Sequence, residues 1–309
     1  RKGVRRGFIK YLCKSCSKWF QINRIKRLNN NVLLNDHLEG FSFRSIAQKY
    51  NISTGGAYSK CFNALESLPH CADLTRNYCS KFSGVLLVDG KFVNVKGYDH
   101  KIPVIYGVDY HTHDIPTYVL SVAENFVSLV KFFRSLRLLN YPLQYLVSDD
   151  NLNIPNACRE IYPKMLWQLC TNHLKENIRK SLEVRTNPFY RPFMFEIETL
   201  LGTKHSEDDF NRIAKNIFNK YKNDSLCVSI LLDLERRKYN LLGFRNTPTT
   251  TNLIESFNSQ FQAKFRLIKS FDSFKYADLW VNGYILKRRY RTFTDCEGKF
   301  KWMNGKKSI

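Results

Sequence analysis

Three acidic residues, Asp89, Asp149 and Glu255, have the chemistry and the setting of ligands for divalent cations. Asp89 follows the apolar run at 85–88, and Asp149 follows the run at 145–148. Each run predicts a strand, and the first is apolar enough to be buried on both faces. Each strand would therefore deliver a carboxylate at or near its end, and acids at the ends of neighbouring strands can share metal ions.

Glu255 stands at the start of a segment with helical periodicity. It lies beside the apolar stripe, so a helix packed on the sheet through its phenylalanines would aim this carboxylate at the two strand acids. Hard cations such as Mg²⁺ or Mn²⁺ prefer oxygen ligands, and two of them about 3.5–4 Å apart can clamp a phosphoryl transfer. The three carboxylates predict a site for two such ions. The stripe consists of Ile254, Phe257, Phe261, Phe265 and Ile268.

Each acid also has a purely structural alternative. Asp89 and Gly90 form a common turn pair, and residues 149–151 suit a helix-capping loop. Asn252 stands three positions before Glu255, which is the spacing of a capping box. The order of the acids, on a strand, a second strand and then a helix, favours the metal site over three separate structural roles.

The segments around these acids predict a mixed sheet covered by helices. Between the second and third acid, from 171 to about 240, only helical and charge-rich patterns occur, so a helical block would interrupt the α/β core. Strands are expected at 85–95, 102–109, 116–122, 143–147 and 166–170, and helices at 126–139, 207–221 and 226–239.

Cys13 and Cys16 form a Cys-x-x-Cys pair in a basic and aromatic setting, which resembles the second half of a zinc ribbon. A closed zinc site needs four ligands, so the first knuckle is expected upstream of residue 1, and the pair by itself is a partial Zn²⁺ site. A chance pair among nine cysteines is the alternative. Other residues that could complete a site are His37, Cys61, His70, Cys71 and Cys79, and their spacing selects none of them.

Residues 32–68 predict two helices joined by a turn, as in a helix-turn-helix. Asn51 suits a left-handed turn, and Ser53 or Thr54 suits the cap of the second helix. That helix would enter the major groove of DNA. An ordinary helical hairpin is the alternative, because Gly55-Gly56 weakens the helix start. The side chains expected to face DNA are Thr54, Tyr58, Ser59 and Lys60.

The composition favours a globular protein with a polyanionic partner. The chain has 309 residues and carries 49 Lys and Arg against 27 Asp and Glu, a formal charge of +22 that is spread along its length. No stretch approaches the ~20 apolar residues of a membrane span. The cysteines are scattered, which indicates a reducing compartment instead of a disulfide framework.

Four runs resemble the blocks of the Mutator-like (MULE) group of DDE transposases and their bacterial relatives: LLVDGKFVNVKG, YLVSDDN, LWQLCTNHLKEN and TTTNLIESFNSQFQAKFR. The resemblance covers about residues 84–270. It implies an RNase H-like core with a helical insertion, in which Asp89, Asp149 and Glu255 bind two Mg²⁺ or Mn²⁺ ions. It also implies a homo-oligomer that brings together terminal repeats of a mobile element and target DNA.

Some motif residues have open roles. Cys170 and His173 match the family's C-x-x-H signature, and they could be a buried thiol with a hydrogen-bonded imidazole or could approach a DNA phosphate. Asn252 belongs to the third block, and Arg266, on the same side of the helix as Glu255, is a candidate to bind DNA. Asp150 stands where the family usually has a small residue, which leaves the second ligand ambiguous by one position.

We therefore predict a transposase that cleaves DNA at the ends of a mobile element and joins the 3′ end to target DNA. The alternatives are a transposase-derived DNA-binding protein or regulator without catalysis, which includes an inactive copy, and an RNase H-like nuclease that does not join strands. The expected compartment is the cytoplasm (nucleoid) in a prokaryote or the nucleus in a eukaryote. The expected parts are 1–31 (partial zinc ribbon), 32–82 (helix-turn-helix region), 83–170 (first part of the catalytic core), 171–248 (helical insertion), 249–292 (second part of the core) and 293–309 (basic tail).

Overall fold

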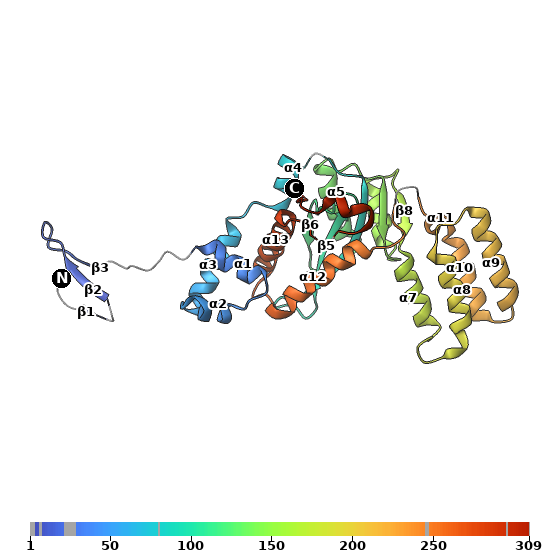
Figure 1. The fold of residues 1–309 in the computed structure, drawn as a ribbon, viewed down its shortest axis with the longest axis horizontal. Coiled ribbons are helices and arrows are strands. Elements are labelled where there is room, and N and C mark those ends of the chain that lie inside the picture. Colours follow the sequence, from blue (N-terminus) through green and yellow to red (C-terminus); the bar gives the residue numbers. More distant parts are fainter. Residues whose placement is uncertain are drawn as a thin grey trace.

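A five-stranded mixed sheet forms the centre of the protein (Figure 1). The computed structural model describes residues 4–5, 8–21, 29–79, 81–244, 247–294 and 296–308. The strands are β4 (Val85–Val93), β5 (Ile102–Asp109), β6 (Tyr118–Leu120), β7 (Tyr145–Ser148) and β8 (Leu166–Leu169). Their order is β6-β5-β4-β7-β8, with antiparallel pairs from β6 to β4 and parallel pairs from β4 to β8. The expectation of a mixed α/β protein is confirmed.

Helices cover both faces of this sheet. Successive residues of a strand point to opposite faces, so they pack in two different clusters. Leu86 and Leu146 belong to one buried cluster, and Leu87 and Val147 belong to the other. A run of consecutive apolar residues suits a strand that is covered in this way. The first cluster includes side chains of α5 (Phe126–Leu138) and α6 (Asn153–Ile161), and the second includes side chains of α12 (Asn252–Ile268) and α13 (Phe274–Tyr290).

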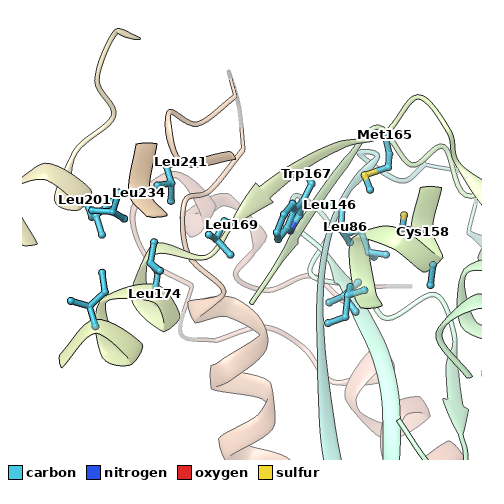
Figure 2. Close-up of a cluster of buried hydrophobic side chains, with 14 of the residues drawn as sticks. Leu86, Leu146, Cys158, Met165, Trp167, Leu169, Leu174, Leu201, Leu234 and Leu241 are labelled. Carbon is cyan, nitrogen blue, oxygen red and sulfur yellow. The ribbon is translucent and has the colours of Figure 1, made fainter. Parts of the chain in front are cut away.

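A block of helices extends from the end of β8 (Figure 1). Its buried leucines, such as Leu174 and Leu234, continue the cluster that begins under the sheet at Leu146 (Figure 2). The Gln168 side-chain amide in β8 donates to the Asn240 carbonyl at 2.8 Å, which fastens the block to the sheet edge. Within the described ranges, no helix combines the length and apolarity needed to cross a membrane. The helices are α7 (Thr171–Ser181), α8 (Arg191–Gly202), α9 (Glu207–Tyr221), α10 (Ser225–Arg236) and α11 (Lys238–Leu241), with a 3₁₀ turn η1 (Pro188–Tyr190).

In the described part of the chain four helices precede the sheet, and two of them are the expected pair of helices joined by a turn. Asn51 adopts φ 51° at the turn, and the Ser53 hydroxyl accepts the Gly56 amide at 3.0 Å, so local turn and cap chemistry sets both boundaries. Ala47 and Ala57 are buried between the helices, where small side chains permit close approach. The helices are α1 (Asn30–Leu38), α2 (Phe43–Tyr50), α3 (Thr54–Glu66) and α4 (Cys71–Tyr78).

A buried histidine joins these helices to the core. His37 of α1 is 1% exposed, its Nδ1 lies 3.0 Å from the Phe41 carbonyl, and its Nε2 lies 2.9 Å from the Tyr276 hydroxyl of α13. The carbonyl can only accept, so Nδ1 donates to it and Nε2 accepts from the tyrosine. Burial lowers the pKa of His37 to about 4, although the bond to Phe41 opposes this shift. The imidazole is therefore held neutral.

Acidification is expected to destabilise the protein through His37. The imidazole titrates at about 6.5 when unfolded and at about 4 when folded, so the unfolded chain binds more protons in this window and stability falls as pH decreases through it. Between pH 7 and pH 4.5 the loss attributable to this one group is about 2 kcal/mol. Urea unfolding of the wild type and of His37→Gln at both pH values measures this loss of stability. The loss should be smaller in His37→Gln by about the amount given above. An equal loss in both proteins would contradict the assignment.

A small three-stranded antiparallel sheet contains the first described residues. Cys13 and Cys16 lie in the turn between its second and third strands, where the Cys13 amide donates to the Lys18 carbonyl at 2.9 Å. Residues 1–3, 6–7 and 22–28 of the expected zinc-ribbon segment lie outside the described residues. The strands are β1 (Val4–Arg5), β2 (Phe8–Leu12) and β3 (Trp19–Gln21).

The C-terminal segment is mostly exposed, and two of its side chains anchor it to the core. Phe293 and Met303 are buried, and the Phe293 amide donates to the Lys306 carbonyl at 2.8 Å. The segment contains the 3₁₀ helix η2 (Gly298–Met303). Single aromatic and apolar anchors thus hold irregular backbone on the core without producing a helical or strand pattern.

Candidate active site

Strand register brings Asp89 and Asp149 together. The parallel ladder between β4 and β7 ends at the pair Leu87 and Val147, and each acid lies two residues beyond that pair. Side chains two apart share a face of a sheet, so both acids follow residues that pack under α12. Asp89 is inside β4 and not at its end, because the strand continues through pairing with β5 alone. The turn alternative for Asp89 and Gly90 is therefore wrong.

Asp89 is held by two donors. Its Oδ1 accepts the Gly90 amide at 2.7 Å, and its Oδ2 accepts the Asn258 side-chain amide at 2.6 Å. The Tyr106 hydroxyl donates to the side-chain oxygen Oδ1 of Asn258, which leaves the side-chain nitrogen Nδ2 to donate to Asp89. Burial raises the pKa of Asp89, the Gly90 bond and His173 lower it, and the charges of two other carboxylates raise it further. Those carboxylates are Asp149 and Glu255.

Asp149 and Asp150 face different surroundings. Asp149 accepts the Asn151 amide at 3.2 Å, and burial, opposed by this bond and by His173, raises its pKa. The Oδ2 atom of Asp150 instead accepts the Asn177 side-chain amide at 3.0 Å and lies 3.7 Å from Arg237 Nη1. Asp150 thus points toward the helical insertion, whereas Asp149 lies on the side of Asp89.

Glu255 lies in the first turn of α12, and the expected apolar stripe places it. Ile254 and Phe257 are buried against the sheet on either side of it. Its Oε1 accepts the hydroxyl proton of Thr251, a fully buried residue, at 2.7 Å. Thr251, not Asn252, is the N-cap residue, so the capping box that was the structural alternative for Glu255 is absent at these two positions. Asn252 accepts the Asn172 side-chain amide at 2.7 Å.

Cys170 and His173 meet the third acid through Thr251. The Thr251 hydroxyl oxygen lies 3.1 Å from Cys170 Sγ and 3.3 Å from His173 Nδ1, and His173 Nδ1 lies 4.0 Å from Glu255 Oε1. Hydrogen bonding to Cys170 raises the pKa of His173 to about 9, although burial opposes it. Burial would raise the pKa of the Cys170 thiol, but bonds to His173 and Thr251 lower it overall. Each member of the pair therefore stabilises the charged form of the other.

Sequence reasoning missed two side chains of this site, Asn258 and Glu124. Glu124 lies in the loop after β6, and a Cβ atom added to Gly90 would stand 2.9 Å from its Oε2. Burial raises the pKa of Glu124, and the charges of Asp149 and Asp89 raise it further. Asn258 stands one helical turn after Glu255, so helical spacing in the sequence could have placed it near the site. No sequence pattern points to Glu124.

The donor set suits hard cations. Carboxylate oxygens predominate, and the charge of His173 lowers the pKa values of both strand acids. Within the described part of the chain, Cys170, His173 and Glu255 form the group whose ligand atoms all lie within 4.8 Å of one another. The three expected acids do not form such a group among the described residues. Mutual repulsion of uncompensated carboxylates favours such separation, and a divalent cation would relieve it.

The expected DNA-contacting residues differ in exposure. Thr54 and Ser59 of α3 and Arg266 of α12 are exposed, and Lys60 is half-buried with its Nζ 3.4 Å from Asn30 Oδ1. The Tyr58 ring stacks on Tyr276 of α13 at 5.4 Å between centroids, so it lies toward the core.

Cys13 and Cys16 stand apart from other metal ligands among the described residues, because no third His, Cys, Asp or Glu joins them in a cluster. The Cys13 thiol pKa is lowered to about 6, chiefly by hydrogen bonding to Ser15.

The mixed sheet thus carries acids beyond adjacent strands, and the helix that covers the same face carries a third. A family model described as "Transposase, Mutator family" matches residues 23–276, which is most of the chain. The chain belongs to the Mutator family of transposases.

Other comparisons add little. A search of curated proteins found no match. One solved structure with partial similarity is the cryo-electron microscopy structure of the simian T-cell lymphotropic virus intasome in complex with the PP2A regulatory subunit B56 gamma. That alignment covers 71% of this chain and 76% of the other, at 10% identity and a TM-score of 0.24. A TM-score this low does not indicate a shared fold.

Proposed function

We propose that this chain is a DDE transposase that cleaves and joins DNA with two divalent cations held by Asp89, Asp149 and Glu255. The observation that carries the proposal is the placement of the acids: two in register beyond one parallel ladder, and the third on the helix that covers the same face. Membership of the Mutator family supplies the biological setting. The core is, on this proposal, RNase H-like, with the helices of 171–248 as an insertion.

The residues around the acids would position the metal ligands. Asn258 holds Asp89, Thr251 orients Glu255, and Glu124 adds a fourth carboxylate beside the two strand acids. When bound, Mg²⁺ or Mn²⁺ would activate the attacking water or 3′-hydroxyl and stabilise the leaving oxygen. No side chain needs to form a covalent bond to DNA in this chemistry.

DNA is the partner that the charge favours. The formal charge of +22 and the exposed residues of α3 suit a chain that contacts many phosphates. We assign recognition of the terminal repeats to the helix-turn-helix of α2 and α3 and to the zinc-ribbon-like segment around Cys13 and Cys16. Pairing of two element ends would require a homo-oligomer.

The test is strand cleavage and joining on DNA that carries the terminal repeats of the element. Activity should require Mg²⁺ or Mn²⁺, disappear with EDTA and fall below detection in Glu255→Gln. Cleavage without joining would instead identify a nuclease. DNA binding without metal-dependent cleavage would identify a regulator that keeps the fold and would overturn the catalytic proposal.

Gly90→Ala is expected to weaken metal binding without unfolding the protein. The three atoms nearest to the added Cβ would belong to the Glu124 carboxylate, at the far end of a flexible side chain, so the carboxylate shifts and the fold is spared. Disturbing a group that supports metal ligands typically lowers affinity by 10-fold or more, so we expect roughly 10-fold weaker Mn²⁺ binding. Electron paramagnetic resonance titration of Mn²⁺ measures it. Gly202→Ala, where an added Cβ meets nothing within 4 Å, is the matched control. Equal affinity in both variants would exclude Glu124 from the site.

A further inference from the structure

A cleft of about 260 Å³ lies beside α12, between this helix and the segment that follows α13. Ser256 and Gln260 line it from α12, and Arg288, Arg291 and Phe293 line it from the end of α13 and beyond. Ser256 directly follows Glu255 in the sequence. The cleft therefore opens on the face of α12 next to the one that carries Glu255. A helix is about 10 Å across, so the cleft lies within about that distance of the third acid.

The cleft is basic. Neither Arg288 nor Arg291 forms an ion pair with a carboxylate in the described ranges, although Glu297 also lines the cleft. The Arg288 guanidinium lies 4.7 Å from the Phe293 ring centroid, and burial lowers its pKa. A guanidinium that is withdrawn from water without a carboxylate partner favours an anionic ligand.

A buried histidine supplies a second, independent sign of a ligand. His113, from the loop after β5, lines the cleft, is 8% exposed, and has an Nε2 atom without a hydrogen-bond partner among the described residues. Phe293 and Phe300 flank its ring, with centroids 5.9 and 4.5 Å away. Burial, and then the charge of Arg288, lowers the pKa of His113 to about 4, so the ring is neutral and can carry one N–H donor. Unsatisfied buried polar atoms are uncommon in folded proteins.

We infer that this cleft binds a phosphodiester group of a DNA strand that passes along α12 to the carboxylate site. The inference rests on the proposed function and adds to it a site that fixes the strand. Two guanidinium groups offer charge and paired donors, and His113, Ser256 and Gln260 offer neutral donors around them. Phosphate contacts fix the position of DNA without reading its sequence. The cleft therefore sets the register of the strand at the acids for any sequence.

The test uses the full chain and a fluorescein-labelled 30-base-pair duplex, with binding measured by fluorescence anisotropy in Ca²⁺ between low and moderate salt. Arg291→Gln should weaken binding several-fold and reduce the slope of log K against log salt by about one. Lys222→Gln removes the same charge from an exposed residue at the end of α9 and is the matched control. Equal effects of the two substitutions on affinity and slope would overturn the cleft while leaving DNA binding intact.

His113→Phe separates a ligand contact from a packing role. The phenyl ring keeps the contacts with Phe293 and Phe300 but lacks Nε2, so DNA affinity should fall several-fold. The melting temperature should fall only by the small cost of placing phenylalanine at φ 55°, which histidine tolerates better. A lower melting temperature with wild-type affinity would make His113 a packing residue and overturn its part in the cleft. Failure of the intact chain to bind DNA at all would overturn both the cleft and the proposed function.

Discussion

Asp149→Asn is expected to slow metal-dependent strand cleavage by at least about 10³-fold, which corresponds to roughly 4 kcal/mol of transition-state free energy. The substitution keeps the size of the side chain and removes the charge that a divalent cation needs. Asp149 shares the sheet face of Asp89, and the two acids stand at matching positions beyond the β4–β7 ladder. Single-turnover cleavage of labelled terminal-repeat DNA in Mg²⁺ measures the effect.

Asp150→Asn is the matched control, because it removes the same charge from the next residue. Asp150 bonds to Asn177 and faces Arg237, on the side of the helical insertion. Cleavage should stay within about 10-fold of the wild-type rate, since a partly exposed ion pair contributes little. Loss of cleavage in Asp150→Asn with retention in Asp149→Asn would mean that the second ligand is shifted by one residue.

Local patterns predicted the strands and helices that support this site. The apolar run before Asp89 could be assigned to a doubly covered strand, and the stripe of α12 showed which face of that helix is buried. Asn51 and Ser53 marked the hairpin of α2 and α3 because turn and cap preferences depend on neighbouring residues alone. Asp89 was expected at or near the end of its strand but lies inside β4, since the strand continues through pairing with β5, which local sequence does not encode.

Contacts between distant segments could not be predicted in this way. Glu124 reaches the strand acids from a loop and depends on the missing side chain of Gly90. Helix α6 was not expected in the short interval between β7 and β8. The role of Thr251 as the common partner of Cys170, His173 and Glu255 appears only when the chain has folded, because 81 positions separate it from Cys170.

Contacts between the start and the end of the helical insertion explain how this long segment leaves the third acid in place. The Thr171 amide at the start of α7 donates to the Thr249 carbonyl at 2.9 Å, and the Thr171 hydroxyl donates to the same carbonyl at 3.1 Å. Together with the bond between Cys170 and Thr251, they tie the exit of the helical block to its return. The position of Glu255 therefore depends on these contacts at the sheet edge and not on the helices of the insertion.

Arg289→Met is expected to lower the free energy of unfolding by about 3–5 kcal/mol, because it strands a buried charge. Arg289 of α13 and Asp114 of the loop after β5 are 0% and 1% exposed, with Nε–Oδ1 and Nη2–Oδ2 distances of 2.9 and 2.8 Å. Arg289 Nη1 also donates to the Cys71 carbonyl and the Thr75 hydroxyl of α4, at 2.9 Å each. The residue thus joins three elements at one point, and urea unfolding measures its contribution.

The double variant Arg289→Met/Asp114→Asn tests whether the stranded charge is the cause. Burial raises the pKa of Asp114 and Arg289 lowers it, so loss of the guanidinium leaves the carboxylate unfavourable in its ionised form. Asparagine removes that charge, and the double variant should recover part of the stability lost in Arg289→Met, a coupling of at least about 1 kcal/mol. Additive losses from the two single substitutions would show that the cost arises from the bonds to α4 and not from the ion pair.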